Sequence, residues 1–325
     1  MRYIHVMAAV IRDAQGRILI AKRPDDAHQG GLWEFPGGKL ENGEDRFDGL
    51  RRELHEELGI RVTQARPLLD IHHDYPDKSV RLDVWLVTGF DGQAHGAEGQ
   101  PVRWVSAAEL DDYDFPAANA PIVQAAQLPE VYLITPDVPD EAELFAGLER
   151  AREMGVRLVQ LRQTGLSTAA YGDLAQRVLA RFGRDFRWLL KGDEPPAWPG
   201  AGWHLTRRQL RQIWLENCGP DASGNRSTAR IDSPLLAASC HDAEELAMAA
   251  EIGVDFVTLS PVMPTATHPD AAPLGWELAQ ELIGTVNMPV YILGGVGPEM
   301  RDRAFESGAQ GVAGIRRFWG EAVFR

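Results

Sequence analysis

Residues 38–60 read GKLENGEDRFDGLRRELHEELGI and carry the strongest structural signal in the chain. The part from 45 to 58 is rich in Arg, Glu and Leu and has no Pro and only one Gly, which predicts a helix. Apolar side chains recur there at three- and four-residue steps and predict a buried stripe, made of Phe47, Leu50, Leu54 and Leu58. Gly59 follows as a typical helix stop.

Glu53, Glu56 and Glu57 are spaced so that their carboxylates share one face of this helix. Like charges at this spacing repel and lower helix stability. Mg²⁺ would convert the repulsion into a site, because it binds carboxylate oxygens together with substrate phosphates. An isolated face of this kind is more often a solvated surface, but the preceding WEFPG at 33–37 and glycines at both ends favour a metal site. Arg52 can offset the negative charge or orient a neighbouring Glu.

The same stretch fits the pattern G-x5-E-x7-R-E-U-x-E-E-x-G-U (U aliphatic) at every fixed position, namely Gly38, Glu44, Arg52, Glu53, Leu54, Glu56, Glu57, Gly59 and Ile60. It therefore resembles the Nudix hydrolases. AHQGGLWEFPGGK at 27–39, EGQP at 98–101 and FPAANAP at 115–121 extend the resemblance to the MutT-type 8-oxo-dGTP diphosphatases. The resemblance covers residues 1–128 and implies an α/β/α sandwich with a mixed sheet.

This resemblance implies roles for individual residues. The implied cofactor is Mg²⁺, with Mn²⁺ as an alternative, and its implied ligands are Gly37, Glu53, Glu56, Glu57 and Glu98. The implied catalytic residues are Glu53 or Glu98 as the base that activates water, together with Arg52. The implied substrate-binding residues are Arg23, Phe35, Lys39 and Asn119. The implied reaction is attack of water on phosphorus in an oxidised purine nucleoside triphosphate, which releases pyrophosphate and a monophosphate and so protects DNA from mutation.

Several of these residues have simpler interpretations. Asn119 follows Pro-Ala-Ala and is also a plausible helix N-cap. Arg23 and Glu98 are also compatible with solvated surface charges, and Phe35 with a core position. Within the matched segments we expect Asn119 to hydrogen-bond the purine edge and Arg23 to contact phosphates. A different diphosphate, such as a thiamine-pathway compound, remains the alternative substrate.

Composition bounds the class of protein. The 325 residues are 44% hydrophobic and 25% charged, which suggests about two domains with sizeable cores. The net charge of −14 argues against direct binding to duplex DNA. Two cysteines, Cys218 and Cys240, form no metal-ligand spacing or disulfide framework, which fits a reducing cytoplasm. The N-terminus does not read as a signal peptide, and no 18-residue apolar run predicts a membrane span.

We place the domains at 1–128 and 129–325, with Pro129 in the linker. In the first, strands are predicted at 5–11 and 17–22 on either side of a turn at 13–16, at 80–87 from the alternation of Leu82, Val84 and Leu86, and at 102–105. A helix capped by Ser106 and a short helix at 120–127 are also predicted. In the second, strands are predicted at 131–135, 158–162, 188–191, 203–206, 235–240, 256–260, 290–293 and 311–315. Helical patterns lie between most of these strands, as at 140–154, 169–182, 243–252 and 298–307, and 216–233 reads as an inserted loop. This alternation predicts a (β/α)8 TIM barrel.

Residues at the predicted carboxyl ends of these strands resemble thiamine-phosphate synthase and its TenI-like relatives, the thiazole tautomerases. The matching pieces are QLR at 160–162, GWHL at 202–205, ASCH at 238–241, SPVMPTATH at 260–268 and GGV at 294–296. They give a candidate site for a phosphorylated ligand, consisting of Arg162, His204, His241, Thr265, Thr267, Gly294 and Gly295.

Three departures from the synthase pattern put its activity in doubt. Gln163 and Thr164 stand where a lysine is expected, Lys191-Gly192 replaces an Asn-Asp pair whose Asp helps hold Mg²⁺, and His268 replaces a second lysine. We therefore expect the barrel to lack synthase activity. A thiazole tautomerase with His241 as general acid and base, a ligand-sensing module and an inert scaffold all remain open.

Overall fold

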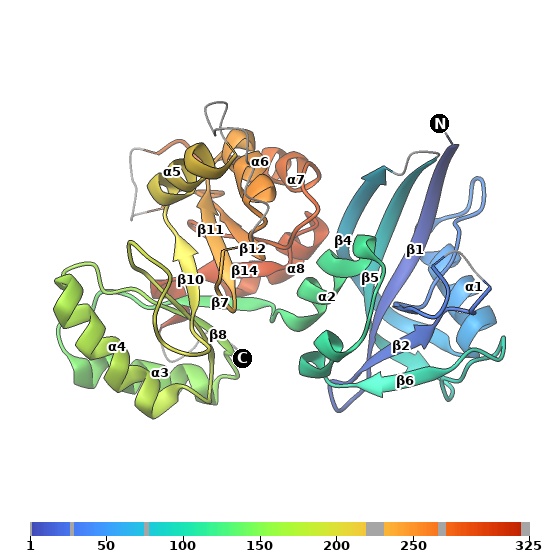
Figure 1. The fold of residues 1–325 in the computed structure, drawn as a ribbon, viewed down its shortest axis with the longest axis horizontal. Coiled ribbons are helices and arrows are strands. Elements are labelled where there is room, and N and C mark those ends of the chain that lie inside the picture. Colours follow the sequence, from blue (N-terminus) through green and yellow to red (C-terminus); the bar gives the residue numbers. More distant parts are fainter. Residues whose placement is uncertain (1, 27–28, 75–77, 219–230, 266–270, 320–325) are drawn as a thin grey trace. The chain divides into compact units, whose positions relative to one another are not determined.

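The computed structural model describes residues 2–26, 29–74, 78–218, 231–265 and 271–319. It divides into two compact units, Met1–Leu128 and Pro129–Arg325, each with its own sheet (Figure 1). The first unit contains β1 (Arg2–Arg12), β2 (Ile18–Lys22), β3 (Trp33–Glu34), α1 (Arg46–Leu58), β4 (Arg61–Asp74), β5 (Lys78–Asp91), β6 (Val102–Val105), η1 (Ala107–Asp112), η2 (Ala117–Asn119) and α2 (Ala120–Gln127).

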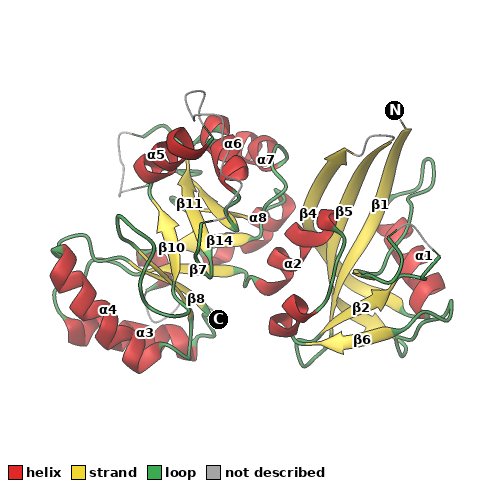
Figure 2. Cartoon of the chain, in the orientation of Figure 1, coloured by secondary structure: helices red, strands yellow, loops and turns green. Residues whose placement is uncertain are grey.

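The sheet of the first unit has the order β3-β2-β1-β5-β4, with β6 paired to β2, and α1 and α2 lie on its opposite sides (Figure 2). Because successive residues of a strand point to opposite faces, β1 supplies both cores. Ala8 and Val10 pack in the core that contains α2, whereas Met7 and Ile11 pack in the core that contains α1. β1 runs parallel to β5 and antiparallel to β2, so the sheet is mixed. The predicted α/β/α sandwich is confirmed.

The helix predicted from residues 45–58 is α1. The side chain of Asp45 caps it by accepting from the backbone N–H groups of Phe47 and Asp48, and Gly59 ends it with φ of 68°. The helix predicted after Ser106 is the 3-10 helix η1, with a capping box between Ser106 and Glu109. The roles of Gly59 and Ser106 were predicted from the sequence because each depends on residues adjacent in sequence. The cap formed by Asp45 was not predicted.

The second unit contains β7 (Val131–Ile134), α3 (Glu141–Glu153), β8 (Leu158–Leu161), α4 (Thr168–Phe182), β9 (Arg187–Leu190), β10 (Gly202–Leu205), α5 (Arg207–Asn217), β11 (Leu236–Cys240), α6 (Ala243–Ile252), β12 (Phe256–Leu259), α7 (Gly275–Ile283), β13 (Val290–Ile292), η3 (Pro298–Met300), α8 (Arg301–Glu306), β14 (Gly311–Gly314) and η4 (Arg316–Phe318). Its strands form a closed barrel with only parallel pairings, in the order β10-β11-β12-β13-β14-β7-β8-β9. The predicted (β/α)8 barrel is confirmed, and each predicted strand lies within a residue or so of an observed one.

The connection from β9 to β10 breaks the alternation, because residues 191–201 contain no helix. Pro195, Pro196 and Pro199 lie in this connection and would each remove a helical hydrogen bond. Most of the predicted loop at 216–233 falls on residues 219–230, which lie outside the described part of the chain, and α5 continues to Asn217.

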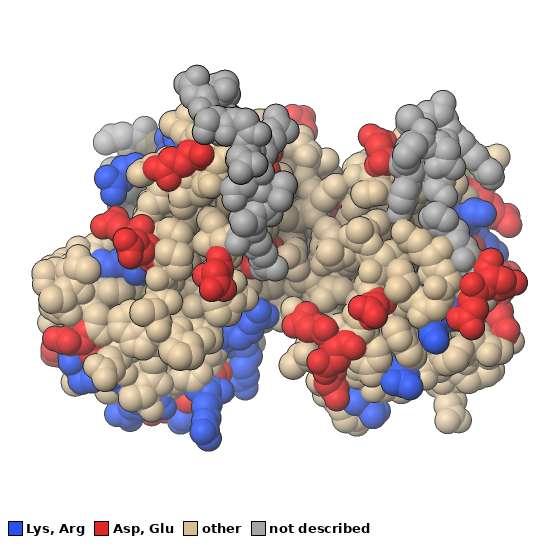
Figure 3. Space-filling model, viewed as in Figure 1, with Lys and Arg blue, Asp and Glu red and all other residues tan. Residues whose placement is uncertain are grey.

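Acidic side chains lie on both units, with basic side chains among them, on the face drawn in Figure 3. Among the described residues, no helix is both long and apolar enough to cross a membrane.

A buried carboxylate joins α1 to the sheet of the first unit. The side chain of Asp83 in β5 is 1% exposed and accepts hydrogen bonds from Arg46 (2.6 Å to Nη2), Trp85 (2.9 Å) and His5 (3.1 Å). Burial alone would raise the pKa of Asp83, but the hydrogen bonds from Arg46 and His5 outweigh burial and hold the pKa below its usual value. Asp83 therefore stabilises the unit in its ionised form.

We predict that Asp83→Asn lowers the stability of the first unit by about 1–3 kcal/mol at pH 7, because it leaves buried donors poorly paired. The pKa is depressed on folding, so the contribution of Asp83 is complete above its unfolded pKa and is lost as pH falls through its folded pKa. The gap between wild type and variant should thus close in acid. Hydrogen exchange of β1 and β5 amides measures it.

Asp91→Asn provides the control for Asp83→Asn, because the Asp91 side chain is 58% exposed and pairs with an exposed Arg61. Its effect should stay within about 0.5 kcal/mol. Equal protection in the two variants at pH 7 would contradict the role given to Asp83.

Candidate functional sites

The acidic face of α1 lies against the loop that follows β3. The backbone N–H of Gly37 donates to Oε2 of Glu57 at 2.7 Å. A Cβ built on Gly38 would lie 2.0 Å from Oε2 of Glu53, so the missing side chain is what makes room for that carboxylate. The loop is fixed to β1, because the N–H of Met7 donates to the carbonyl of Gly38 and that of Ala9 to the carbonyl of Pro36. The carboxylates of Glu53 and Glu57, which were predicted as metal ligands, therefore both lie against the backbone of Gly37 and Gly38.

Arg52 neutralises part of this face. Its guanidinium donates to both carboxylate oxygens of Glu44, at 2.8 and 2.9 Å, and to Oε1 of Glu53 at 2.7 Å. It also donates to the carbonyl of Lys39 at 3.1 Å and lies 3.4 Å from Glu56. The hydrogen bond from Arg52 lowers the pKa of Glu44 to about 2. Arg52 thus orients Glu53. Orienting a neighbouring Glu is one of the two roles that the sequence suggested for Arg52.

The segment after β5 packs on the end of α1 and carries Glu98. The N–H of His95 donates to the carbonyl of Leu58 at 3.2 Å, and the N–H of Ala97 donates to the carbonyl of Glu57 at 2.9 Å. These bonds use carbonyls that a helix leaves without intrahelical partners. Glu98 itself is exposed and lies near enough to Glu57 to affect its pKa.

The donor set fits a divalent cation. Burial raises the pKa of Glu57 to about 7, and the charges of Glu34 and Glu98 add to the rise. A bound cation would relieve this crowding of negative charge, and carboxylate with backbone oxygen is the donor chemistry that Mg²⁺ takes. Among the described residues, no three acidic, histidine or cysteine side chains converge closely enough to form a metal site in their present rotamers. The ligand set stays a prediction.

Three of the predicted substrate residues, Arg23, Phe35 and Lys39, lie in the segments that follow β2 and β3. Arg23 forms an ion pair with Glu34, a contact that the sequence analysis did not predict. Burial raises the pKa of Glu34, with Arg23 opposing the rise. Phe35 is buried and stacks on Phe115 at 5.3 Å between ring centroids, so it belongs to the core of the first unit. The side chain of Lys39 is exposed.

Asn119 occupies the N-cap position of α2, but its side chain makes no capping hydrogen bond. Within the described part of the chain, no side-chain hydrogen bond of Asn119 is present, and the residue is half-buried. Asn119 therefore does not make the side-chain hydrogen bond that defines a capping residue, which argues against the simpler interpretation. Its amide is left available to a ligand.

Most of the predicted barrel residues line one cavity of about 950 Å³ at the carboxyl ends of the strands. The predicted residues among its lining are Arg162, His204, His241, Thr265, Gly294 and Gly295. Thr267 and His268 lie outside the described residues. The described lining contains no Asp or Glu, although the chain as a whole carries a net charge of −14. It includes residues that the sequence analysis did not assign to the site, namely Gln160, Lys191, Ser239, Arg316 and Arg317.

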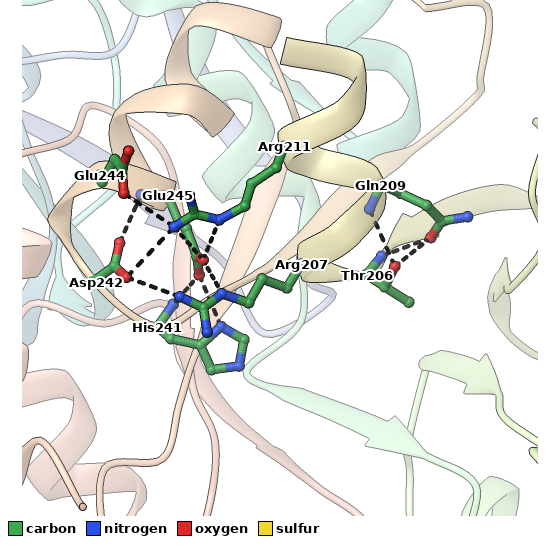
Figure 4. Close-up of polar contacts among 8 residues, drawn as sticks. All are labelled: Thr206, Arg207, Gln209, Arg211, His241, Asp242, Glu244 and Glu245. Carbon is green, nitrogen blue, oxygen red and sulfur yellow. Dashed lines mark hydrogen bonds and ion pairs between the residues drawn. The ribbon is translucent and has the colours of Figure 1, made fainter. Parts of the chain in front are cut away.

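His241 is oriented by a buried carboxylate (Figure 4). Its Nδ1 lies 2.9 Å from Oε2 of Glu245, whose side chain is 0% exposed. Arg207 and Arg211 also bind this carboxylate. Burial alone would raise the pKa of Glu245, but hydrogen bonds from His241 and the two arginines outweigh burial and lower the pKa. The bond to Nδ1 leaves Nε2 of His241 without a protein partner among the described residues.

His204 is buried in the barrel, and Lys191 is half-buried directly after β9. Nδ1 of His204 lies 2.7 Å from the hydroxyl of Tyr132, and its Nε2 lies 2.9 Å from Oγ of Ser239. Burial lowers the pKa of His204 to about 4, so the ring is neutral near pH 7. Burial also lowers the pKa of Lys191, whose ammonium donates to the carbonyl of Gln163. His204 is therefore a fully satisfied histidine in the barrel wall.

Comparison with known proteins supports both resemblances. Residues 7–125 match the family model described as NUDIX domain, and residues 131–318 match the model described as Thiamine monophosphate synthase. An 8-oxo-dGTP diphosphatase of Escherichia coli (strain K12) is 37% identical over 123 residues, which are 38% of this chain and 95% of that protein. A CTP pyrophosphohydrolase of the same organism is 38% identical over 125 residues, which are 38% of this chain and 92% of that protein.

For the second unit, a putative thiamine-phosphate synthase 2 of Aquifex aeolicus (strain VF5) is 31% identical over 196 residues, which are 59% of this chain and 98% of that protein. The acidic face of α1 and the cavity of the closed barrel thus lie in segments that match two separate families over nearly the whole length of their relatives. The chain is a Nudix hydrolase in its first part and belongs to the thiamine monophosphate synthase family in its second.

Proposed function

We propose that the first unit hydrolyses 8-oxo-dGTP to the monophosphate and pyrophosphate with Mg²⁺, and so removes an oxidised precursor from the nucleotide pool. The observation that supports this most is the placement of the Glu53 and Glu57 carboxylates against the Gly37-Gly38 backbone. The related protein of Escherichia coli is named an 8-oxo-dGTP diphosphatase, and its similarity to this chain extends over 123 residues.

Gly37, Glu53, Glu56, Glu57 and Glu98 would hold the cation, and Mn²⁺ could replace Mg²⁺. When bound, the cation would neutralise phosphoryl charge and lower the pKa of water. Arg52 keeps the Glu53 carboxylate in place through the 2.7 Å bond to Oε1. Either Glu53 or Glu98 would accept the proton of the attacking water. Arg23 would exchange its contact with Glu34 for a contact with a substrate phosphate. Lys39, which follows Glu34 closely in the sequence, would also bind the substrate.

Pyrophosphate release by the full-length chain tests the proposal, with 8-oxo-dGTP, dGTP and CTP compared at low micromolar concentration. We expect strong preference for 8-oxo-dGTP and dependence on Mg²⁺. Glu57→Gln should reduce kcat at least about 100-fold, the scale on which loss of a transition-state contact acts. CTP is the substrate in the name of a second relative. If the protein prefers CTP or a thiamine-pathway diphosphate, the proposed substrate is wrong and the proposed hydrolase activity still stands.

Asn119 should read the base. Oxidation of guanine changes its pattern of donors and acceptors, and a buried group left unpaired costs about 1–3 kcal/mol. Asn119→Ala should therefore reduce the ratio of kcat/KM for 8-oxo-dGTP over dGTP by about 10-fold. Each substrate serves as the control for the other on the same protein, since a folding defect lowers both values together. An unchanged ratio would exclude base recognition by this side chain.

We also propose that residues 129–325 form a separate domain that binds a phosphorylated small molecule and lacks synthase activity. Lys191-Gly192 stands where the synthase pattern has an Asn-Asp pair with a metal-binding Asp. Lys191 lines the cavity, and no acidic side chain is present in the described lining. The bond between His241 and Glu245 favours a second activity for this domain, namely proton transfer of the thiazole tautomerase kind.

Isomerisation of thiazole phosphate carboxylate by the full-length chain tests the tautomerase activity. His241→Asn should abolish it, and Glu245→Gln should reduce it, because the ring loses its orienting carboxylate. Neither change should affect pyrophosphate release from 8-oxo-dGTP, because that activity belongs to the first unit. Retained binding of the thiazole compound in a thermal-shift titration serves as the control for folding of the second unit. No isomerisation by the wild type, with binding of the compound retained in a thermal-shift titration, would favour a ligand-sensing domain.

A further inference from the structure

Gln100 lies between two residues that are proposed to bind the cation. Its side-chain Oε1 accepts from the backbone N–H of Glu98 at 3.0 Å. Its Nε2 donates to the backbone carbonyl of Glu57 at 3.0 Å and lies 3.5 Å from Oε1 of the Glu57 carboxylate. One amide group therefore uses both its acceptor and its donors to connect Glu98 with Glu57.

The turn that carries Glu98 is built tightly around Gln100. The N–H of Gly99 donates to the carbonyl of Gly96 at 3.0 Å, and Gly99 has φ of 88°. A Cβ on Gly96 would lie 1.8 Å from the carbonyl oxygen of Gln100, so the backbone at 96 closes directly onto that residue. Glu98 is exposed at the tip of this turn. The turn consequently fixes where the backbone of Glu98 lies relative to the end of α1.

The other side of the contact is the last turn of α1. The carbonyl of Glu57 receives two donors, the N–H of Ala97 at 2.9 Å and the amide of Gln100 at 3.0 Å. The bond from Ala97 involves only the backbone and survives any change of side chain. Gln100 alone among the described residues bonds both the turn of Glu98 and the residue Glu57 through its side chain.

We propose that Gln100 is a positioning residue that sets the spacing between the carboxylates of Glu57 and Glu98 and thereby the affinity of the first unit for a divalent cation. The inference rests on the proposed function, because it takes both carboxylates as ligands. Outer partners that orient ligands commonly change metal affinity by about 10- to 100-fold when they are replaced.

Binding of Mn²⁺ alone to the full-length chain tests this inference without turnover, since free Mn²⁺ is measured directly by electron paramagnetic resonance. Gln100→Met keeps the length of the side chain and removes all its hydrogen bonds. It should weaken Mn²⁺ binding by about 10- to 100-fold. Gln93→Met is the matched control, because Gln93 is exposed in the same segment and its side chain makes no hydrogen bond to another described residue. The control should bind Mn²⁺ as the wild type does.

A double-mutant cycle separates positioning from general loosening of the fold. If Gln100 acts by placing Glu98, Gln100→Met should weaken Mn²⁺ binding far less in a Glu98→Gln background than in the wild type. Equal effects in the two backgrounds, or wild-type affinity in Gln100→Met, would overturn the proposal. If the proposed metal site itself is wrong, the result is different, because Glu57→Gln will then leave Mn²⁺ binding unchanged.

Discussion

The candidate site of the first unit depends on how α1 accommodates three carboxylates on one face. Repulsion among Glu53, Glu56 and Glu57 would by itself weaken α1. Arg52 binds Glu53 and reaches toward Glu56, and the backbone N–H of Gly37 binds Glu57, so the charge is met from the helix itself and from a loop fixed to β1. Since these contacts leave Glu57 with a pKa of about 7, the arrangement still lacks positive charge. The proposed cation would supply it.

Most elements were predictable, because α1 buries a regular stripe, whereas β1 and the barrel strands contain short and nearly continuous apolar runs. β4 (Arg61–Asp74) was not predicted. Its pairing with β5 shifts register between Val62 and Gln64, again next to Ala65, and between Pro67 and Leu69, which disrupts the alternation that identifies a strand. β3 is only two residues long and carries no period at all.

The candidate sites were predictable to the extent that their residues follow motifs or end strands. The six described barrel residues meet at one cavity because parallel strands bring their carboxyl ends together. The pair of Arg23 with Glu34 depends on how β2 pairs with β3, and the bonds of Gln100 depend on how the segment after β5 packs on α1. No local pattern encodes either arrangement. Lys191 was noted in the sequence as a departure from the synthase pattern, and only the closed barrel shows that it faces the cavity.

The attachment of the Glu98 segment to α1 has a consequence for how this segment can vary between related proteins. His95 and Ala97 make their bonds to the helix end through backbone N–H groups, so their side chains are free to change without loss of those bonds. Gly96 has no such freedom, because a Cβ there would lie 1.8 Å from a carbonyl oxygen. Sequence change should therefore be fast at 97 and slow at 96, a contrast between adjacent positions that reflects shape and not distance from the chemistry.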